Sequence, residues 1–160
     1  DQRLSRGLGD VYKRQSSAAT IPINLKTVEE NLGVKKSVAS FTVPLGATIN
    51  MDGTAIMQGV ATVFLANTYG IDLNFADYLS VILVATLASI GTAGVPGVGL
   101  IMLTMVLNQV GLPAEGIALI IGIDRILDMA RTAVNVTGDA TISCIVAKVE
   151  KKIDMKIINF

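Results

Sequence analysis

Apolar residues gather in segments that are each too short to cross a lipid bilayer. Residues 37–49 and 55–68 contain no Asp, Glu, Lys or Arg and are 13 and 14 residues long. A helix of that length is about 20 Å long, whereas the hydrocarbon core of a membrane is about 30 Å thick. The sequence NMDGT at 50–54 separates them, with the charged Asp52 beside a glycine. The pattern predicts a broken helix over 37–68 whose two halves together reach across a membrane.

A second pair of short apolar segments follows. YLSVILVATLASI and VGLIMLTMVLNQV flank the sequence GTAGVPG at 91–97, and no charged residue occurs from Tyr78 to Ala114. Pro96 lacks an N–H and the glycines add backbone freedom, so one straight helix is not expected. A kinked span, two short spans and a re-entrant hairpin are all compatible with this pattern. The half-length segments favour a re-entrant hairpin over 77–110, whose tip must line a cavity or a ligand.

The remaining segments complete an all-α membrane protein. Residues 16–31 read as an amphipathic helix, and 115–148 as a last transmembrane helix followed by a tail at 151–160. Residues 1–15 are polar and Arg-rich, and we interpret them as a non-native segment preceding a fragment of a longer protein. Lysines flank the apolar segments, whereas the loops at 69–77 and 111–115 contain no Lys or Arg. By the positive-inside rule, both ends of the apolar region, and with them the C-terminus, face the cytoplasm.

Composition supports a membrane protein and argues against several other classes. The chain is 51% hydrophobic and 16% charged, with a mean hydropathy of +0.60, whereas soluble proteins are about 25% charged. Its net charge is zero, so no nucleic-acid partner is expected. With no His and one Cys, neither a disulfide framework nor a thiolate or imidazole metal site is expected. A soluble enzyme with a phosphate loop in GTAGVPGVG is disfavoured because the GK[ST] ending is absent. We expect no enzyme and assign no catalytic residue.

A polar stripe runs along the last predicted helix. Its members are spaced by 4, 3, 4 and 4 residues and share one helical face; they are Asp124, Asp128, Arg131, Asn135 and Asp139. On a soluble amphipathic helix these charges would simply face water. Beside uncharged apolar segments, each charge costs about 2.5–3.5 kcal/mol to insert, so such residues usually face a cavity and mark a transport pathway.

The charges on the stripe predict what it binds. Together with Arg125 and Asp52, the stripe has an excess of two negative charges, which favours a cation held by hard oxygen ligands. Sodium fits, although potassium and protons remain alternatives. Arg131 can bind a carboxylate through two hydrogen bonds, and Asp128 can bind an ammonium, which describes a receptor for an amino acid with an additional carboxylate. Alternatively, these two side chains pair with each other. Broken helices and an interrupted hairpin are marks of secondary transporters, and an ion channel is a further alternative.

Four motifs now point to a family. They occur in order as SS…TIP at 16–22, NMDGT at 50–54, SIGTAGVPG at 89–97 and DMARTAVNVTGD at 128–139. With them the chain resembles the dicarboxylate/amino acid:cation symporter family, the glutamate and aspartate:sodium symporters. The resemblance implies a partial transport domain over 16–150. In it, 16–31 would be the second arm of hairpin 1, 37–68 a broken helix, 77–110 hairpin 2 and 115–148 the last transmembrane helix.

The resemblance also implies a substrate site. Asp128 would meet the amino group of the substrate and Arg131 its side-chain carboxylate. Family members selective for neutral substrates lack this arginine, so Arg131 indicates glutamate or aspartate. A dicarboxylate, neutral amino acid or proton-coupled member is the alternative, although Gln58, at the position of the proton-carrying Glu of eukaryotic members, cannot titrate. The full implied set is Ser17, Thr54, Val95, Gly99, Asp128, Arg131, Thr132 and Asn135.

Sodium would be transported cargo rather than a catalytic cofactor. Carboxylates, amides, hydroxyls and main-chain carbonyls would form three sites, and part of the third would lie outside this chain. The residues implied are Gly46, Thr48, Asn50, Met51, Asp52, Ser89, Ile90, Thr92, Asn135 and Asp139. The resemblance further implies a homotrimer in the lipid bilayer of the cell membrane, spanning it several times.

Overall fold

The described part of the protein is all-helical. The computed structural model describes residues 17–90 and 97–157. The helices are α2 (Ser17–Glu30), α3 (Lys36–Ile49), α4 (Asp52–Tyr69), α5 (Phe75–Ile90), α6 (Val98–Gln109), η1 (Ala114–Gly116), α7 (Ile117–Ile121) and α8 (Asp124–Val149). The predicted all-α class is therefore confirmed for these residues. Their one β-type pairing is an isolated antiparallel bridge between Val34 and Ile153.

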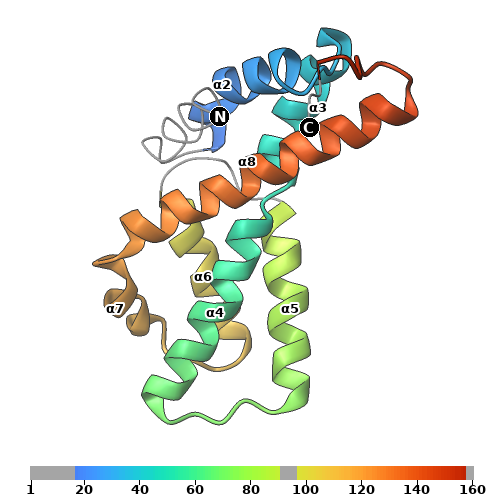
Figure 1. Cartoon of the computed structure of the whole chain (residues 1–160). Helices are drawn as coiled ribbons and strands as arrows, with labels where there is room; N and C mark the ends of the chain where they lie inside the picture. Colours follow the sequence, from blue (N-terminus) through green and yellow to red (C-terminus); the bar gives the residue numbers. More distant parts are fainter. Residues whose placement is uncertain (1–16, 91–96, 158–160) are drawn as a thin grey trace.

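Helix α8 crosses the molecule and connects its two halves (Figure 1). Helices α2 and α3 pack on each other and on α8 near its C-terminal half, whereas α4, α5 and α6 form a bundle beneath its N-terminal half. The chain passes between the halves at the junction of α3 and α4, and both of these helices contact α8. Helix α8 therefore crosses the broken helix formed by α3 and α4 close to its interruption.

The break between α3 and α4 is short. Asn50 (φ −110°, ψ 82°) and Met51 (φ −115°, ψ 53°) leave helical geometry, although the Asn50 N–H still donates to the Gly46 carbonyl at 2.8 Å. Helix α4 restarts at Asp52, whose carboxylate lies in the first turn, where the helix dipole favours negative charge. The interruption seen in the sequence at 50–54 is thus confined to two residues.

Side chains fix the turn into α5. The Asn74 side-chain oxygen accepts hydrogen bonds from the N–H groups of Ala76 (2.8 Å) and Asp77 (3.2 Å). Asp77 in return accepts one from the Asn74 N–H at 2.9 Å. This reciprocal pattern is a capping box, which satisfies donors that a helix start leaves open. Helices α5 and α6 then pack together. Residues 91–96 between them, including the site predictions Thr92 and Val95, lie outside the described residues.

The segment 115–148 is divided, rather than forming the single helix expected. It contains the end of η1, the short α7 and most of α8, with a turn at Gly122 and Ile123. Glycine costs about 1 kcal/mol in a helix interior, and Ile123 has φ −113° and ψ −1°. The polar stripe consequently starts in the first turn of α8, at Asp124.

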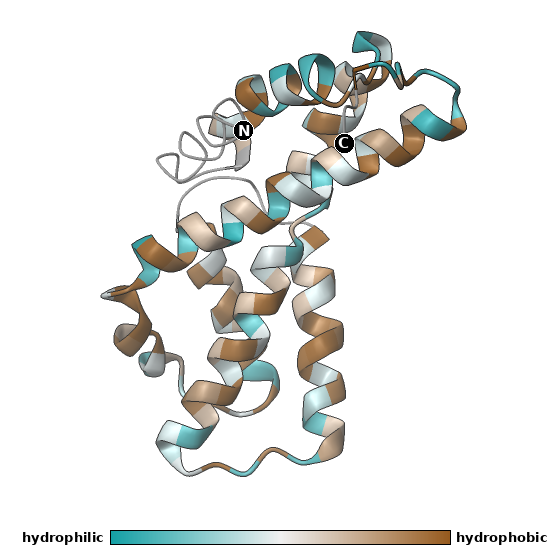
Figure 2. Ribbon diagram, in the orientation of Figure 1, coloured by the Kyte–Doolittle hydropathy of each residue, from teal (hydrophilic) through white to brown (hydrophobic). Residues whose placement is uncertain are grey.

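Three apolar clusters hold the helices together. One joins α4 to α6 and α7 around Leu65, Leu103 and Leu107, which are completely buried. The others join α2 and α3 to α8, and α5 to α6. The outer side of α5 is apolar as well, and its Leu79, Ile82, Leu83 and Leu87 are exposed (Figure 2).

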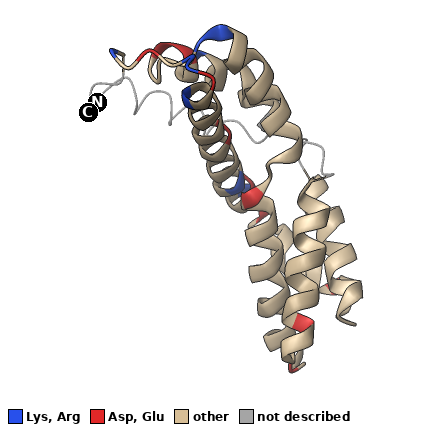
Figure 3. Cartoon of the chain, turned by 90° about the vertical axis from the view of Figure 1, so that its right-hand side faces the viewer, with Lys and Arg blue, Asp and Glu red and all other residues tan. Residues whose placement is uncertain are grey.

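Charge is distributed unevenly along the molecule. Lysines gather at the end formed by the α2–α3 connection and the C-terminus of α8, while α4, α5 and α6 contain no Lys or Arg (Figure 3). No helix in the described ranges has both the length and the apolar character needed to span a bilayer.

Candidate functional site

The buried face of α8 carries the candidate site. Arg131, Asn135 and Asp139 occupy successive turns and are 5%, 3% and 1% exposed. Asp139 and Asn135 contact the break between α3 and α4, and the Arg131 guanidinium contacts Gly99 at the start of α6. Asp124 and Asp128 extend the same face and keep 17% and 15% of their side chains exposed. The helical spacing seen in the sequence is thus a real polar face directed inward.

Asp139 is held at the end of α3. The Asn50 side-chain amide donates to its Oδ1 at 3.0 Å. Gly46 lies so close that a Cβ there would overlap Asp139 Oδ1. From the other helix, a Cβ on Gly138 would lie 2.7 Å from Asn50 Nδ2 and 3.6 Å from Asp52 Oδ2. The carboxylates of Asp52 and Asp139 and the amide of Asn50 therefore lie close together at the break, and glycines allow this close approach.

Asn135 binds the first turn of α4. Its side-chain oxygen accepts a hydrogen bond from the Gly53 N–H at 2.8 Å. The first N–H groups of a helix have no partner within the helix, so Asn135 caps α4 from another helix. A Cβ on Gly53 would be 2.6 Å from the Arg131 carbonyl oxygen and 2.9 Å from its Cα. The two backbones consequently touch here.

Arg131 is paired with two carboxylates. Its Nη2 donates to Asp128 Oδ1 at 2.7 Å and to Asp124 Oδ1 at 3.2 Å, and the guanidinium lies on Gly99 of α6. Pairing of Asp128 with Arg131, the alternative left open by the sequence, is the arrangement in this structure. Arg131 Nη1 has no hydrogen-bond partner among the described residues. A buried charge needs such partners. Asp124, which lies on the stripe but was not in the implied substrate set, is the second carboxylate that pairs with Arg131.

The other predicted site residues divide into buried and exposed groups. Thr54, Thr132, Met51 and Ser89 are buried, and the Ser89 hydroxyl donates to the Thr86 carbonyl at 2.8 Å. By contrast, Thr48, Ile90 and Asp52 are exposed, and the Thr48 hydroxyl donates to the Leu45 carbonyl at 2.7 Å. Ser17 is the first residue of α2.

A buried pair of hydroxyl groups lies one helical turn beyond Asp139 on α8, and it was not predicted from the sequence. The hydroxyls of Thr42 and Ser143 lie 2.7 Å apart, Thr42 Oγ1 donates to the Val38 carbonyl, and Ser143 Oγ donates to the Asp139 carbonyl. Ser143 is four residues beyond Asp139, so continuing the stripe by one turn would have found it. Gln58 was noted for its position only; its side chain is completely buried and neither amide atom has a hydrogen-bond partner within the described residues.

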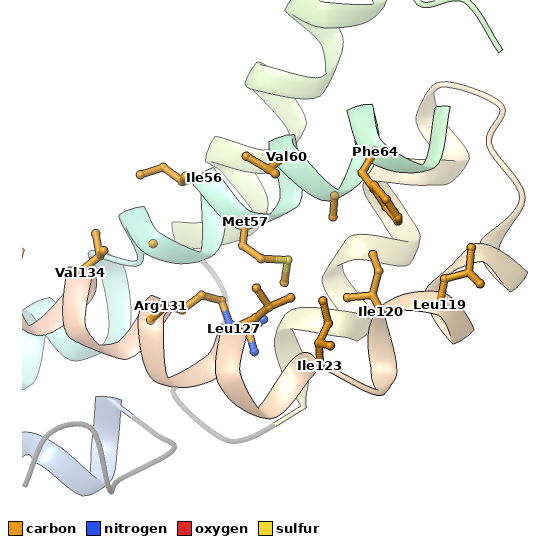
Figure 4. A pocket seen from close by; sticks show the side chains of 13 residues that line it. Ile56, Met57, Val60, Phe64, Leu119, Ile120, Ile123, Leu127, Arg131 and Val134 are labelled. Atoms are coloured by element: carbon orange, nitrogen blue, oxygen red, sulfur yellow. The ribbon is translucent and has the colours of Figure 1, made fainter. Parts of the chain in front are cut away.

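An apolar cavity adjoins the site. It has a volume of about 420 Å³ and lies between α4, α7 and α8, with Met57, Phe64, Ile120 and Leu127 among its walls (Figure 4). Arg131 contributes to its lining from α8. In residues 17–90 and 97–157, no three His, Cys, Asp or Glu side chains gather closely enough to hold a metal ion. The side-chain oxygens at the break belong to carboxylate and amide groups, which are ligands that suit hard cations.

Comparison with known proteins identifies the class of protein. Residues 12–149 match the sequence model of the Sodium:dicarboxylate symporter family, and the chain therefore belongs to this family. It is 51% identical over 125 residues to an excitatory amino acid transporter of Caenorhabditis elegans, covering 78% of this chain and 25% of the relative. It is 50% identical over 137 residues to excitatory amino acid transporter 3 of Mus musculus, covering 86% and 26%. Excitatory amino acid transporter 1 of Rattus norvegicus is 50% identical over 125 residues, covering 78% and 23%. The chain spans about a quarter of the length of these relatives.

Proposed function

We propose that a full-length protein containing this chain is a secondary symporter that couples sodium entry to uptake of glutamate or aspartate. The single observation that carries the proposal is the setting of Arg131. This buried arginine has carboxylates on Nη2, and its Nη1 has no hydrogen-bond partner among the described residues. Family membership supports sodium coupling. The names of the relatives, excitatory amino acid transporters, support an amino acid substrate.

Substrate binding would exchange partners at Arg131. The side-chain carboxylate of the substrate accepts hydrogen bonds from the guanidinium, in the two-bond geometry that arginine favours. Asp128, released from Nη2, then accepts from the substrate ammonium group, while Asp124 continues to neutralise Arg131. The remaining contacts follow the family resemblance and come from Ser17, Thr54, Val95, Gly99, Thr132 and Asn135.

Sodium ions would bind at the helix break. Asp139 and Asn50 are already joined there, and the Gly46 main chain lies against Asp139. An ion at this place neutralises a carboxylate whose burial otherwise opposes its charge. The residues proposed to ligate sodium are Gly46, Thr48, Asn50, Met51, Asp52, Ser89, Ile90, Thr92, Asn135 and Asp139.

The proposed setting is the cell membrane. There, α3 and α4 form a broken transmembrane helix, α5 and α6 form a re-entrant hairpin, and the C-terminus faces the cytoplasm. After sodium and substrate bind, the tip at 89–97 closes as the outer gate and the loaded transport domain moves across the bilayer. The full-length protein is proposed to be a homotrimer in contact with lipid.

Uptake into proteoliposomes tests this function. The full-length protein is reconstituted, and labelled aspartate is supplied with an inward sodium gradient or with choline replacing sodium. Saturable, stereoselective uptake that depends on sodium is expected. Equal uptake under both conditions would disprove sodium coupling. Stimulation by a proton gradient alone, or transport of a dicarboxylate in place of aspartate, would support a different member of the family, and non-saturable flux would support a channel.

A further inference from the structure

Arg131 lies between two glycines from different helices. Gly53 of α4 touches its main chain, and Gly99 in the first turn of α6 touches its guanidinium. A Cβ on Gly99 would overlap Arg131 Nη1 and would lie 2.9 Å from Cζ and 3.5 Å from Nη2. Both glycines and the arginine are buried. The position of the guanidinium therefore depends on the absence of a side chain at residue 99.

Helix formation alone does not explain a glycine at this position. Gly99 is absent from the glycines with positive φ, which in the described residues are Gly33, Gly70, Gly97 and Gly111. Alanine is therefore compatible with the backbone there, and alanine would favour the helix by about 1 kcal/mol over glycine. The contact with Arg131 is the feature of this site that alanine would disturb.

Moving the guanidinium aside would disturb the hydrogen bonds that hold it. The Arg131 main chain is pressed against Gly53, and Nη2 is held by Asp128 and Asp124. A methyl group on residue 99 must therefore displace Nη1 and Cζ, or push the start of α6 away from α8. Either response changes the position of Nη1, the guanidinium nitrogen without a partner among the described residues, relative to the start of α6. Hydrogen bonds weaken steeply when their geometry is disturbed.

We propose that Gly99 is a specificity-determining position that acts through Arg131. By lacking a side chain, it seats the guanidinium against the first turn of α6. In the substrate-bound protein, Nη1, which is buried and has no hydrogen-bond partner among the described residues, would bind the second carboxylate of an acidic amino acid. This inference rests on the proposed function, since it assigns Gly99 to the recognition of that substrate class. It differs from a main-chain contact between Gly99 and the substrate, because the effect of a side chain here requires Arg131.

A double-mutant cycle in the full-length protein tests the inference. Aspartate and sodium affinities are measured by calorimetry for the wild type, Gly99→Ala, Arg131→Ala and the double variant. We expect Gly99→Ala to weaken aspartate binding about tenfold, which corresponds to about 1.4 kcal/mol and lies within the coupling energies of contacting residues. In the Arg131→Ala background, the same change should alter aspartate affinity less than about twofold. Sodium affinity without amino acid should be unchanged by Gly99→Ala.

Gly59→Ala is the matched control. Gly59 is in helix α4, and a Cβ there meets no atom within 4 Å. Equal aspartate affinities for Gly99→Ala and Gly59→Ala, in a protein whose wild type binds aspartate, would overturn this inference and leave the proposed function intact. A wild type that binds no acidic amino acid would overturn both. If Gly99→Ala fails to fold, recovery of folding in the double variant supports the steric relationship, and failure of the double variant as well overturns it.

Discussion

The side-chain oxygen of Asn135 on α8 accepts a hydrogen bond from the Gly53 N–H at the start of α4. The two residues are 82 positions apart in the chain, yet this bond satisfies a helix start in the manner of an N-cap. It links the polar stripe of α8 directly to the NMDGT motif. The junction therefore connects the proposed substrate residues with the proposed sodium residues through a structural contact.

Replacing Asn135 with Leu should destabilise the protein. Loss of a capping interaction costs about 0.5–2 kcal/mol, and the buried Gly53 N–H would be left without this acceptor. Thermal unfolding of the full-length protein in detergent measures the effect. Asn67→Leu, at an exposed position of α4, is the control, and equal melting temperatures for the two variants would contradict the prediction.

Replacing Arg131 with Ala should strongly weaken aspartate binding. Hydrogen bonds to charged groups contribute about 1.5–3 kcal/mol, and the change also leaves Asp124 and Asp128 close together without their shared cation. We expect a reduction in aspartate affinity on the order of tenfold to a hundredfold, measured by calorimetry at saturating sodium. Lys148→Ala, which removes a positive charge from an exposed residue of the same helix, is the comparison. Unchanged affinity in Arg131→Ala would refute the assigned carboxylate-binding role.

Replacing Gly46 with Ala should weaken sodium binding. The added Cβ would overlap Asp139 Oδ1 and lie 2.8 Å from its Cγ, so the carboxylate must turn and its hydrogen bond to Asn50 must lengthen. A typical hydrogen bond contributes about 1 kcal/mol, so sodium affinity should fall about fivefold. Sodium dependence of aspartate uptake measures the change, with Gly59→Ala as the reference. A sodium dependence identical to that of the reference would show that Asp139 is not part of the ion site.

The Thr42 and Ser143 hydroxyls should show coupled effects on stability. The two hydroxyl groups have two protons but make three contacts: one with each other at 2.7 Å and one each with a main-chain carbonyl. One hydroxyl proton must therefore serve both the contact between them and a carbonyl. Thr42→Val and Ser143→Ala should each destabilise the protein by about 1 kcal/mol, because each leaves a buried partner less well bonded. The double variant should lose less than the sum, since removal of both polar groups leaves neither hydroxyl unpaired. Strict additivity in chemical unfolding would contradict the coupling.

Features that depend only on neighbouring residues could be predicted from the amino-acid sequence. Helical spacing placed Asp124, Arg131 and Asp139 on one face because the period of a helix is local. Small and polar residues at 50–54 located the helix break, and four ordered motifs identified the family. The turn before α8 was missed, since Gly122 was read as part of a continuous apolar segment.

Contacts between side chains on different helices could not be predicted in this way, because they depend on how the helices pack. Whether Arg131 binds Asp128 or stands apart from it depends on rotamers and on the helix packed opposite. The contacts of Gly99 with Arg131, and of Gly46 with Asp139, join residues far apart in the chain, and no local pattern encodes them. A glycine in a sequence signals backbone freedom or close approach, and only the packed helices reveal which group approaches it.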